Sequence, residues 1–158
     1  MALFLVRHAK AGSRSDWSGD DRVRPLTKAG WSQARAIADR LATVASELRT
    51  SPYVRCRQTL EPLATRLGRT VTECPELTEG AGFGPLVDLL DTLPDGTVMC
   101  SHGDVIPAVI DALLRRGARL VGEPSWRKGV IWTLERTPGS PAIVSVEATD
   151  VDASGADR

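Results

Sequence analysis

Each of the two histidines in the chain comes directly after a short apolar segment. His8 follows residues 3–6 and Arg7, and His102 follows residues 97–101. In an open α/β sheet, ligands bind at the carboxyl ends of the strands. Two neighbouring parallel strands would therefore bring both imidazoles to one pocket. A single histidine is usually structural, but both histidines share this unusual setting. A neutral imidazole can act as a nucleophile and form a covalent intermediate, so we expect both to be catalytic.

The arginines near these histidines favour phosphoryl-transfer chemistry. Arg7 precedes His8, and Arg55 falls in the first turn of an expected helix, where free N–H groups and the helix dipole attract anions. A guanidinium pairs bidentately with phosphate oxygens, and phosphoryl transfer depends mainly on positioning and cationic stabilisation. A carboxylic acid that protonates the leaving oxygen would complete such a site. Glu79 is the first candidate for this acid, and Glu76 is the second.

Several residues near these motifs are candidates for binding the substrate. Cations of this kind are usually solvated surface groups, so we expect only some of them to contact a phosphate. No His-x-x-x-His spacing occurs, and two histidines are few for a zinc site. We therefore expect no metal and no other cofactor. The candidate substrate-binding residues are Lys10, Ser13, Gly103, Arg127 and Lys128, with Arg14 as a further cation.

The composition is that of an ordinary globular domain. The 158 residues are 42% apolar and 25% charged, which suits one domain with a single core. Twenty basic and twenty acidic residues leave no net charge to attract nucleic acid or an acidic membrane. The three cysteines, Cys56, Cys74 and Cys100, form no Cys-x-x-Cys pair and favour a reducing cytoplasm. We expect a cytoplasmic protein that acts on phosphorylated small molecules or phosphohistidine proteins; the oligomeric state stays open.

The chain alternates apolar segments of strand length with segments whose apolar residues recur at helical spacing. Thr27 is the expected N-cap of the first helix. Ser51 and Pro52 are the expected start of the second helix, and Gly68 is its expected end. This alternation predicts an α/β fold with three layers, α/β/α, and a mainly parallel central sheet. Strands are expected at 3–6, 47–50, 70–74 and 97–101, a connector at 117–129, a hairpin at 130–135 and 142–147, and a flexible tail at 148–158 after a domain spanning 1–147.

Four short motifs together resemble the histidine phosphatase, or phosphoglycerate mutase-like, superfamily. They occur in the family's order and spacing, and the resemblance extends from Leu3 to about Leu134. It implies a phosphoglycerate mutase-like fold and a phosphorylated nucleophile at His8. It also implies a phosphate pocket completed by the two arginines and the second histidine, and it supports Glu79 as the acid because residues 77–79 are similar to the family's Leu-x-Glu. The motifs are Arg7-His8-Ala9, Pro25-Leu26-Thr27-x-x-Gly30, Ser51-Pro52-x-x-Arg55-x-x-x-Thr59 and Ser101-His102-Gly103.

Within that superfamily, the small size and the Arg24-Pro25-Leu26-Thr27 segment are most similar to SixA-type phosphohistidine phosphatases. Residues 18–21, 55–64 and 127–129 are in addition similar to the histidine phosphatase module that follows a Nudix domain in some actinobacterial MutT-type proteins. The resemblance therefore implies a metal-independent phosphatase that acts on phosphohistidine or on small phosphomonoesters. A nucleotide-linked phosphatase, with or without a separate Nudix partner, is the alternative. A mutase and a non-catalytic module that binds phosphorylated ligands are further alternatives.

Overall fold

A seven-stranded mixed sheet forms the centre of the computed structural model, which describes residues 1–151. Its strands are β1 (Ala2–Arg7), β2 (Leu48–Thr50), β3 (Val71–Glu73), β4 (Val98–Ser101), β5 (Arg119–Val121), β6 (Ile131–Arg136) and β7 (Ile143–Thr149). They lie in the order β3-β2-β4-β1-β6-β7-β5. β1 is parallel to β4, β2 is parallel to β3 and β4, and β5 is parallel to β7. β6 is antiparallel to β1 and β7. Because the other strand pairs are all parallel, the sheet is mainly parallel, as expected.

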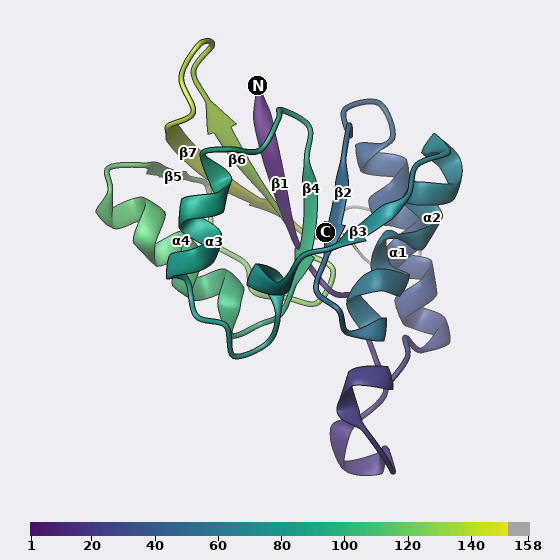
Figure 1. Cartoon of the computed structure of the whole chain (residues 1–158). Coiled ribbons are helices and arrows are strands. Elements are labelled where there is room, and N and C mark those ends of the chain that lie inside the picture. Colours follow the sequence, from purple (N-terminus) through teal and green to yellow (C-terminus); the bar gives the residue numbers. More distant parts are fainter. Residues whose placement is uncertain (152–158) are drawn as a thin grey trace.

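Helices cover both faces of this sheet and complete the expected three layers (Figure 1). Helices α1 (Lys28–Leu41) and α2 (Val54–Leu67) pack on one face, and α3 (Gly84–Leu90) and α4 (Val105–Arg115) pack on the other. Successive side chains of a strand point to opposite faces. In β1, Leu3 and Leu5 accordingly join the α3 and α4 core, whereas Phe4 and Val6 join the α1 and α2 core. None of these helices is long and apolar enough to cross a membrane.

The pairing of β1 with β4 brings the two histidines together. In this parallel pair, Arg7 lies opposite Ser101, so the next residue of each strand leaves the sheet at the same edge. The main-chain N–H of His8 donates to the Ser101 carbonyl at 3.0 Å. The register of two central strands therefore places His8 beside His102, as the sequence predicts.

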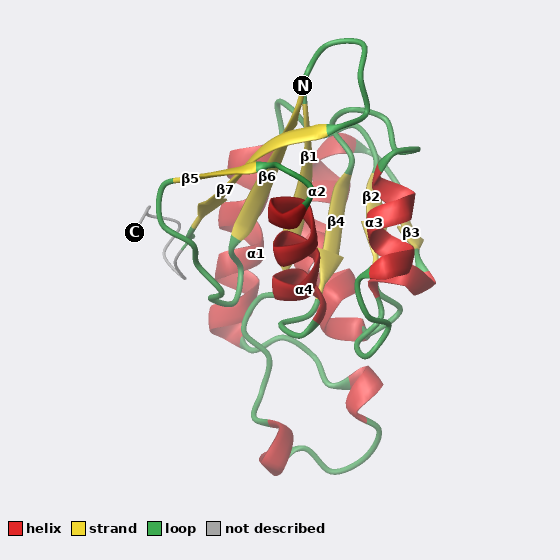
Figure 2. Ribbon diagram, turned by 90° about the vertical axis from the view of Figure 1, so that its left-hand side faces the viewer, coloured by secondary structure: helices red, strands yellow, loops and turns green. Residues whose placement is uncertain are grey.

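The loop between β1 and α1 projects beyond this edge of the sheet (Figure 2). It contains two short 3₁₀ helices, η1 (Arg14–Asp16) and η2 (Asp21–Val23). An antiparallel bridge between Ala11 and Leu26 closes its base. The Thr27 hydroxyl then caps α1 by accepting the Gly30 N–H at 3.1 Å, which confirms the expected N-cap. The loop is thus anchored at both ends beside the histidines.

The second helix begins later than predicted. α2 begins at Val54, with Tyr53 as its N-cap residue, rather than at Ser51 and Pro52. The Ser51 hydroxyl lies 2.8 Å from a ring nitrogen of His102, so this side chain bonds the imidazole instead of capping the helix. At the other end, Gly68 has φ of 64°, in the left-handed region expected of a terminating glycine.

Two boundaries near the carboxyl end also differ from expectation. The expected connector at 117–129 contains the short strand β5, which only its pairing with β7 reveals. β7 continues to Thr149, and Val151 is only 6% exposed, so the ordered structure extends past the predicted boundary at Glu147. The remainder of the predicted tail, residues 152–158, lies outside the described residues.

Candidate active site

His8 is held as a neutral imidazole with a defined tautomer. Its Nδ1 lies 2.8 Å from the Ala9 carbonyl oxygen. A carbonyl can only accept, so Nδ1 carries the proton and Nε2 keeps its lone pair. The side chain is 6% exposed, and burial lowers the pKa of His8 to about 3. Nearby cationic side chains contribute to this lowered pKa, whereas the Ala9 hydrogen bond opposes the shift. At neutral pH, the Nε2 atom is therefore available as a nucleophile.

His102 lies next to His8 and is itself buried, with 1% of its surface exposed. The two ring centroids are 5.6 Å apart, and the rings meet edge to face at 63°. The Nε2 atom of His102 lies 2.8 Å from Ser51 Oγ, while its Nδ1 atom has no hydrogen-bond partner. The Tyr53 ring packs edge-on against the same imidazole at 4.7 Å. One ring nitrogen is thus anchored, and the other is left for a ligand.

Arg55 lies in the first turn of α2, as predicted, and is 1% exposed. Its Nη1 atom donates to the main-chain carbonyl of Asp21 at 2.9 Å, and its Nη2 atom lies 3.1 Å from the Asp21 carboxylate. The guanidinium also lies over the Tyr53 ring, 4.9 Å from the ring centroid. The Nε atom has no partner. These contacts fix the orientation of Arg55 and leave one donor unused.

Arg7 reaches the same region from the end of β1. Its Nη1 atom donates to the Trp126 carbonyl, and its buried Nε atom has no partner. Burial lowers the pKa of this guanidinium. A Cβ atom on Gly103 would lie 2.7 Å from the Arg7 Cζ atom, so only glycine leaves room for the guanidinium there. We predicted Gly103 as a substrate contact, and the structure shows it packed against Arg7.

The unpartnered donors identify the kind of ligand that fits. Within residues 1–151, the buried side-chain nitrogen and oxygen atoms without a hydrogen bond are Arg7 Nε, Arg55 Nε and His102 Nδ1. Leaving a buried polar group unsatisfied costs about 1–3 kcal/mol. An anion that accepts from all three would recover this energy. This arrangement suits a phosphoryl group next to the His8 imidazole.

A hydrogen-bonded threonine connects the segments that carry these groups. The Thr59 hydroxyl accepts the Ala9 N–H at 2.9 Å and donates to the Arg55 carbonyl at 2.7 Å. The segment after His8 is thereby tied to the first turn of α2. Thr59 was visible in the sequence only as part of a family-like motif, and its geometry gives that motif a physical reason.

A cavity of about 790 Å³ opens beside His8. Four of the five predicted substrate-binding residues line it, namely Lys10, Ser13, Gly103 and Lys128. Arg127 is exposed and does not line the cavity, so the structure does not bring it to the site. The lining includes six cationic side chains and two carboxylates: Arg7, Lys10, Arg14, Arg24, Arg55 and Lys128, with Glu79 and Asp104.

Glu79, the first candidate for the acid, lies at this cavity. It comes shortly after the 3₁₀ helix η3 (Pro75–Leu77). Its Oε1 atom is 3.0 Å from Arg14 Nη2, and its Oε2 atom is 3.6 Å from Arg55 Nη2. Glu76 instead accepts from the Cys74 thiol and does not line the cavity. Of the two candidate acids, only Glu79 lines the cavity and lies close to Arg55.

Asp21 is the residue that sequence reasoning missed. Its carboxylate contacts Arg24 at 2.8 Å, Arg55 at 3.1 Å and Arg14 at 3.6 Å. Burial alone would raise the pKa of Asp21, but the Arg24 hydrogen bond and the three positive charges outweigh burial and lower it. The carboxylate therefore stays ionised and joins the loop to Arg55. In the sequence, Asp21 lies in a polar loop, where residues 18–21 resemble the Nudix-fused module but indicate no role for Asp21.

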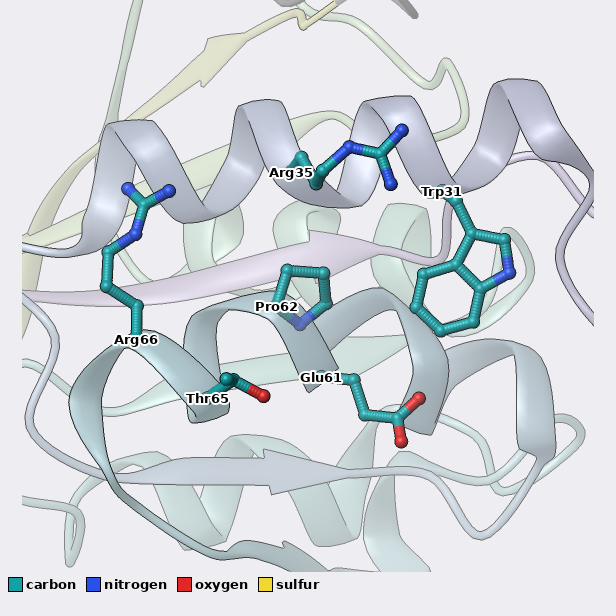
Figure 3. A pocket seen from close by; sticks show the side chains of 6 residues that line it. All are labelled: Trp31, Arg35, Glu61, Pro62, Thr65 and Arg66. Atoms are coloured by element: carbon teal, nitrogen blue, oxygen red, sulfur yellow. The ribbon is translucent and has the colours of Figure 1, made fainter.

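A second hollow, of about 590 Å³, lies between α1 and α2 (Figure 3). Trp31 and Arg35 come from α1, and the other lining side chains come from α2. None of the predicted site residues lines it. Its lining residues are Trp31, Arg35, Glu61, Pro62, Thr65 and Arg66. Of these two cavities, only the one beside His8 is lined by predicted site residues.

Comparisons with known proteins agree with this geometry. The family model of the histidine phosphatase superfamily (branch 1) matches residues 3–89. A protein of Mycolicibacterium smegmatis, named 8-oxo-(d)GTP phosphatase, is 37% identical over 145 residues. The match covers 87% of this chain and 45% of that protein, so the chain spans about half the length of this curated relative.

Solved structures share the fold. The protein histidine phosphatase SixA, in complex with tungstate, superposes with a TM-score of 0.69 at 24% identity, over 100% of this chain and 93% of that one. A mycobacterial glucosyl-3-phosphoglycerate phosphatase, in complex with VO₃, gives a TM-score of 0.67 at 16% identity, over 97% and 99% of the two chains. These likenesses show the phosphoglycerate mutase-like architecture that the sequence predicts.

Proposed function

We propose that the chain, which belongs to branch 1 of the histidine phosphatase superfamily, is a phosphatase whose reaction passes through a phosphoryl group carried by His8. One observation carries this proposal. The neutral His8 imidazole, with Nε2 unprotonated, lies among three buried donors that have no acceptor. This combination supplies both the nucleophile and the charge stabilisation that phosphoryl transfer requires.

In the first step, His8 Nε2 attacks the phosphorus atom, and the bond to the leaving oxygen breaks. Arg7 and Arg55 donate from Nε to the equatorial oxygens, where negative charge develops. Ser51 Oγ accepts the Tyr53 N–H at 3.3 Å and has its own proton free for His102 Nε2. We assign the imidazole proton of His102 to Nδ1, which has no hydrogen-bond partner among the described residues and can donate to a phosphoryl oxygen. Water then attacks the phosphohistidine and releases inorganic phosphate.

An alkoxide leaving group requires a proton, and Glu79 is the residue we assign to supply it. Its position in the cavity supports this assignment, and the role requires that Glu79 enter the step carrying the proton. A bound phosphate would compete with the carboxylate for Arg55. Such competition would release Glu79 toward the leaving oxygen.

We further propose that hydrolysis needs no metal ion. The buried Arg55 guanidinium, the half-buried Arg7 guanidinium and an imidazole offer the positive charge and the donors that a metal would otherwise provide. Within the described residues, no group of three histidine, cysteine, aspartate or glutamate side chains could hold a metal ion. Activity should therefore persist in excess EDTA.

Phosphohistidine and small phosphomonoesters are the substrates we propose first. A nucleotide substrate is the second candidate, because the cavity holds more cations than one phosphoryl group needs and the Mycolicibacterium smegmatis relative is named for a nucleotide. A mutase or a non-catalytic binding module would give different products, and the experiment below separates them.

Hydrolysis of p-nitrophenyl phosphate, a phosphohistidine peptide and nucleotides in EDTA tests the proposal. Alcohol or acceptor release should equal phosphate release in the wild type, and His8→Ala should abolish both. Phosphate transfer to an acceptor without net release would indicate a mutase. Ligand binding without turnover across the panel would indicate a non-catalytic module. Wild-type turnover in His8→Ala would contradict the mechanism.

A further inference from the structure

The cavity beside His8 contains more positive charge than one phosphoryl group requires. Arg7, Arg55 and His102 are sufficient for the group that reacts at His8. Lys10 and Lys128 line the same cavity, and within residues 1–151 neither ammonium group has a carboxylate or hydrogen-bond partner. The reacting phosphoryl group alone therefore does not account for the positive charge of these two lysines.

One glutamine side chain holds the two lysine segments next to each other. Gln33 of α1 accepts the Lys10 main-chain N–H at 2.8 Å and donates from Nε2 to the Lys128 carbonyl at 3.3 Å. The next residue, Gly129, donates its N–H to the His8 carbonyl at 3.2 Å. Both lysines are thus fixed, through their main chains, beside the strand end that carries the nucleophile.

The charges around Lys128 repel its own charge. Burial lowers the pKa of Lys128, and the positive charges of Arg7, Arg24, Lys10 and Arg55 lower it further. Like charges gathered at one cavity raise the free energy of the protein when no anion is bound. A ligand with several negative charges would relieve that repulsion. The arrangement therefore favours a polyanionic substrate.

The two carboxylates of the cavity do not neutralise these lysines. Glu79 pairs with Arg14 and Arg55, and Asp104 accepts the Gly80 N–H at 2.8 Å. The acidic side chains are therefore engaged with other groups, and the positive charge of the lysines is left for the ligand.

We propose that Lys10 and Lys128 bind a second phosphate, and that the substrates are organic diphosphates whose terminal phosphoryl group is transferred to His8. This inference rests on the phosphohistidine mechanism proposed above. The bond between His8 Nε2 and the terminal phosphorus forms as the P–O anhydride bond breaks, and the electron pair stays on the bridging oxygen. Lys10 and Lys128 neutralise the departing organic phosphate. Water then attacks the phosphorus of the phosphohistidine, the P–N bond breaks with its electron pair returning to His8 Nε2, and inorganic phosphate leaves together with a proton from the water.

The chemistry of this leaving group fits the cavity. A phosphate monoester has a second pKa of about 6, so it departs as an anion at neutral pH and needs no proton from an acid. Glu79 then has no proton to supply, whether or not the bound phosphate displaces it from Arg55. Cations, rather than a general acid, become the main requirement on the leaving-group side.

ADP and AMP are suitable probes, because they share a nucleoside and differ by one phosphate. We expect Lys10→Met and Lys128→Met each to lower kcat/KM for ADP by about tenfold, because the loss of one hydrogen bond to a charged partner weakens binding by about this factor. The double variant should lower kcat/KM for ADP by about a hundredfold. Hydrolysis of AMP and p-nitrophenyl phosphate should fall by a clearly smaller factor than hydrolysis of ADP, because neither substrate has a second phosphate for these lysines to bind. Lys28→Met, at the exposed start of α1, removes the same charge outside the cavity and should leave all three rates unchanged.

Inhibition adds a readout that does not depend on turnover of ADP. Pyrophosphate should inhibit the wild type more strongly than inorganic phosphate, and the double variant should lose that preference. Equal losses for ADP and AMP in the double variant would overturn the inference, as would an equal effect of Lys28→Met. Wild-type hydrolysis of p-nitrophenyl phosphate through His8, without hydrolysis of ADP, would overturn this inference alone. A wild type that hydrolyses none of the probes would overturn the proposed function and this inference with it.

Discussion

Asp21→Asn removes one negative charge from the network around Arg55 and keeps the main-chain carbonyl that also holds this arginine. Asp21 does not line the cavity, so it acts as a positioning residue through Arg55. Arg55 is 1% exposed, and its contact with the carboxylate is 3.1 Å long. A hydrogen bond to a charged group contributes about 1.5–3 kcal/mol. If this energy is lost from the alignment of Arg55, kcat falls by about tenfold to 150-fold.

Steady-state hydrolysis of p-nitrophenyl phosphate measures this effect. Asp20→Asn is the matched control, because Asp20 is the neighbouring carboxylate of the same loop and pairs with Arg22 rather than Arg55. Asp20→Asn should change kcat by less than about twofold. Asp21→Glu, which restores the charge, should recover part of the lost activity. Circular dichroism should show that each variant keeps its fold.

A double-mutant cycle decides whether the effect passes through Arg55. Residues that act through one another give strongly non-additive effects. Asp21→Asn should therefore cost little further activity once Arg55 has been replaced by alanine. An equal loss from Asp21→Asn in the wild type and in the Arg55→Ala background would refute the reasoning, as would a comparable loss from Asp20→Asn.

Other predictions follow from the same geometry. Arg55→Ala and His102→Ala should each lower kcat by a factor of about 10²–10³, which is the usual effect of losing one charge-stabilising donor. Losses below about tenfold in both variants would mean that the pocket is assigned wrongly. Gly103→Ala places a Cβ atom 2.7 Å from a guanidinium and should lower activity at least about tenfold, whereas Gly84→Ala, with no atom within 4 Å, should not. Because burial lowers the pKa of His8 to about 3, NMR should show no titration of His8 near pH 6.5. The free energy of unfolding should fall as the pH drops below 6.5, because the unfolded state then takes up a proton on His8 that the folded state does not.

The fold could be predicted largely because its signals are local. Helical and strand periodicities, the Thr27 cap and the Gly68 terminus all lie within short segments. The strand β5 was missed because its three residues are at least partly exposed and are fixed only by pairing with β7. The start of α2 was wrong because the Ser51 hydroxyl bonds His102, a partner 51 residues away. Local propensity cannot show such a partner.

The residues of the candidate site were likewise predictable only where their signal is local in the sequence. His8, His102 and Arg55 follow from strand ends and a helix start, which the sequence shows. Asp21 and Gln33 hold functional side chains through contacts between distant segments, so their types alone gave no signal. Arg127 was included as one of several cations that could bind the substrate, but its side chain does not line the cavity.

The most direct test of the central claim is a search for phosphate on His8. The wild type and His8→Ala would be mixed briefly with a reactive small phosphoester in EDTA, and intact mass and peptide mapping would follow. We predict an acid-labile phosphate on the peptide that contains His8, formed together with the released alcohol and absent from His8→Ala. Turnover of the phosphoester with no label on His8 at any mixing time, or with the label on another residue, would contradict the account.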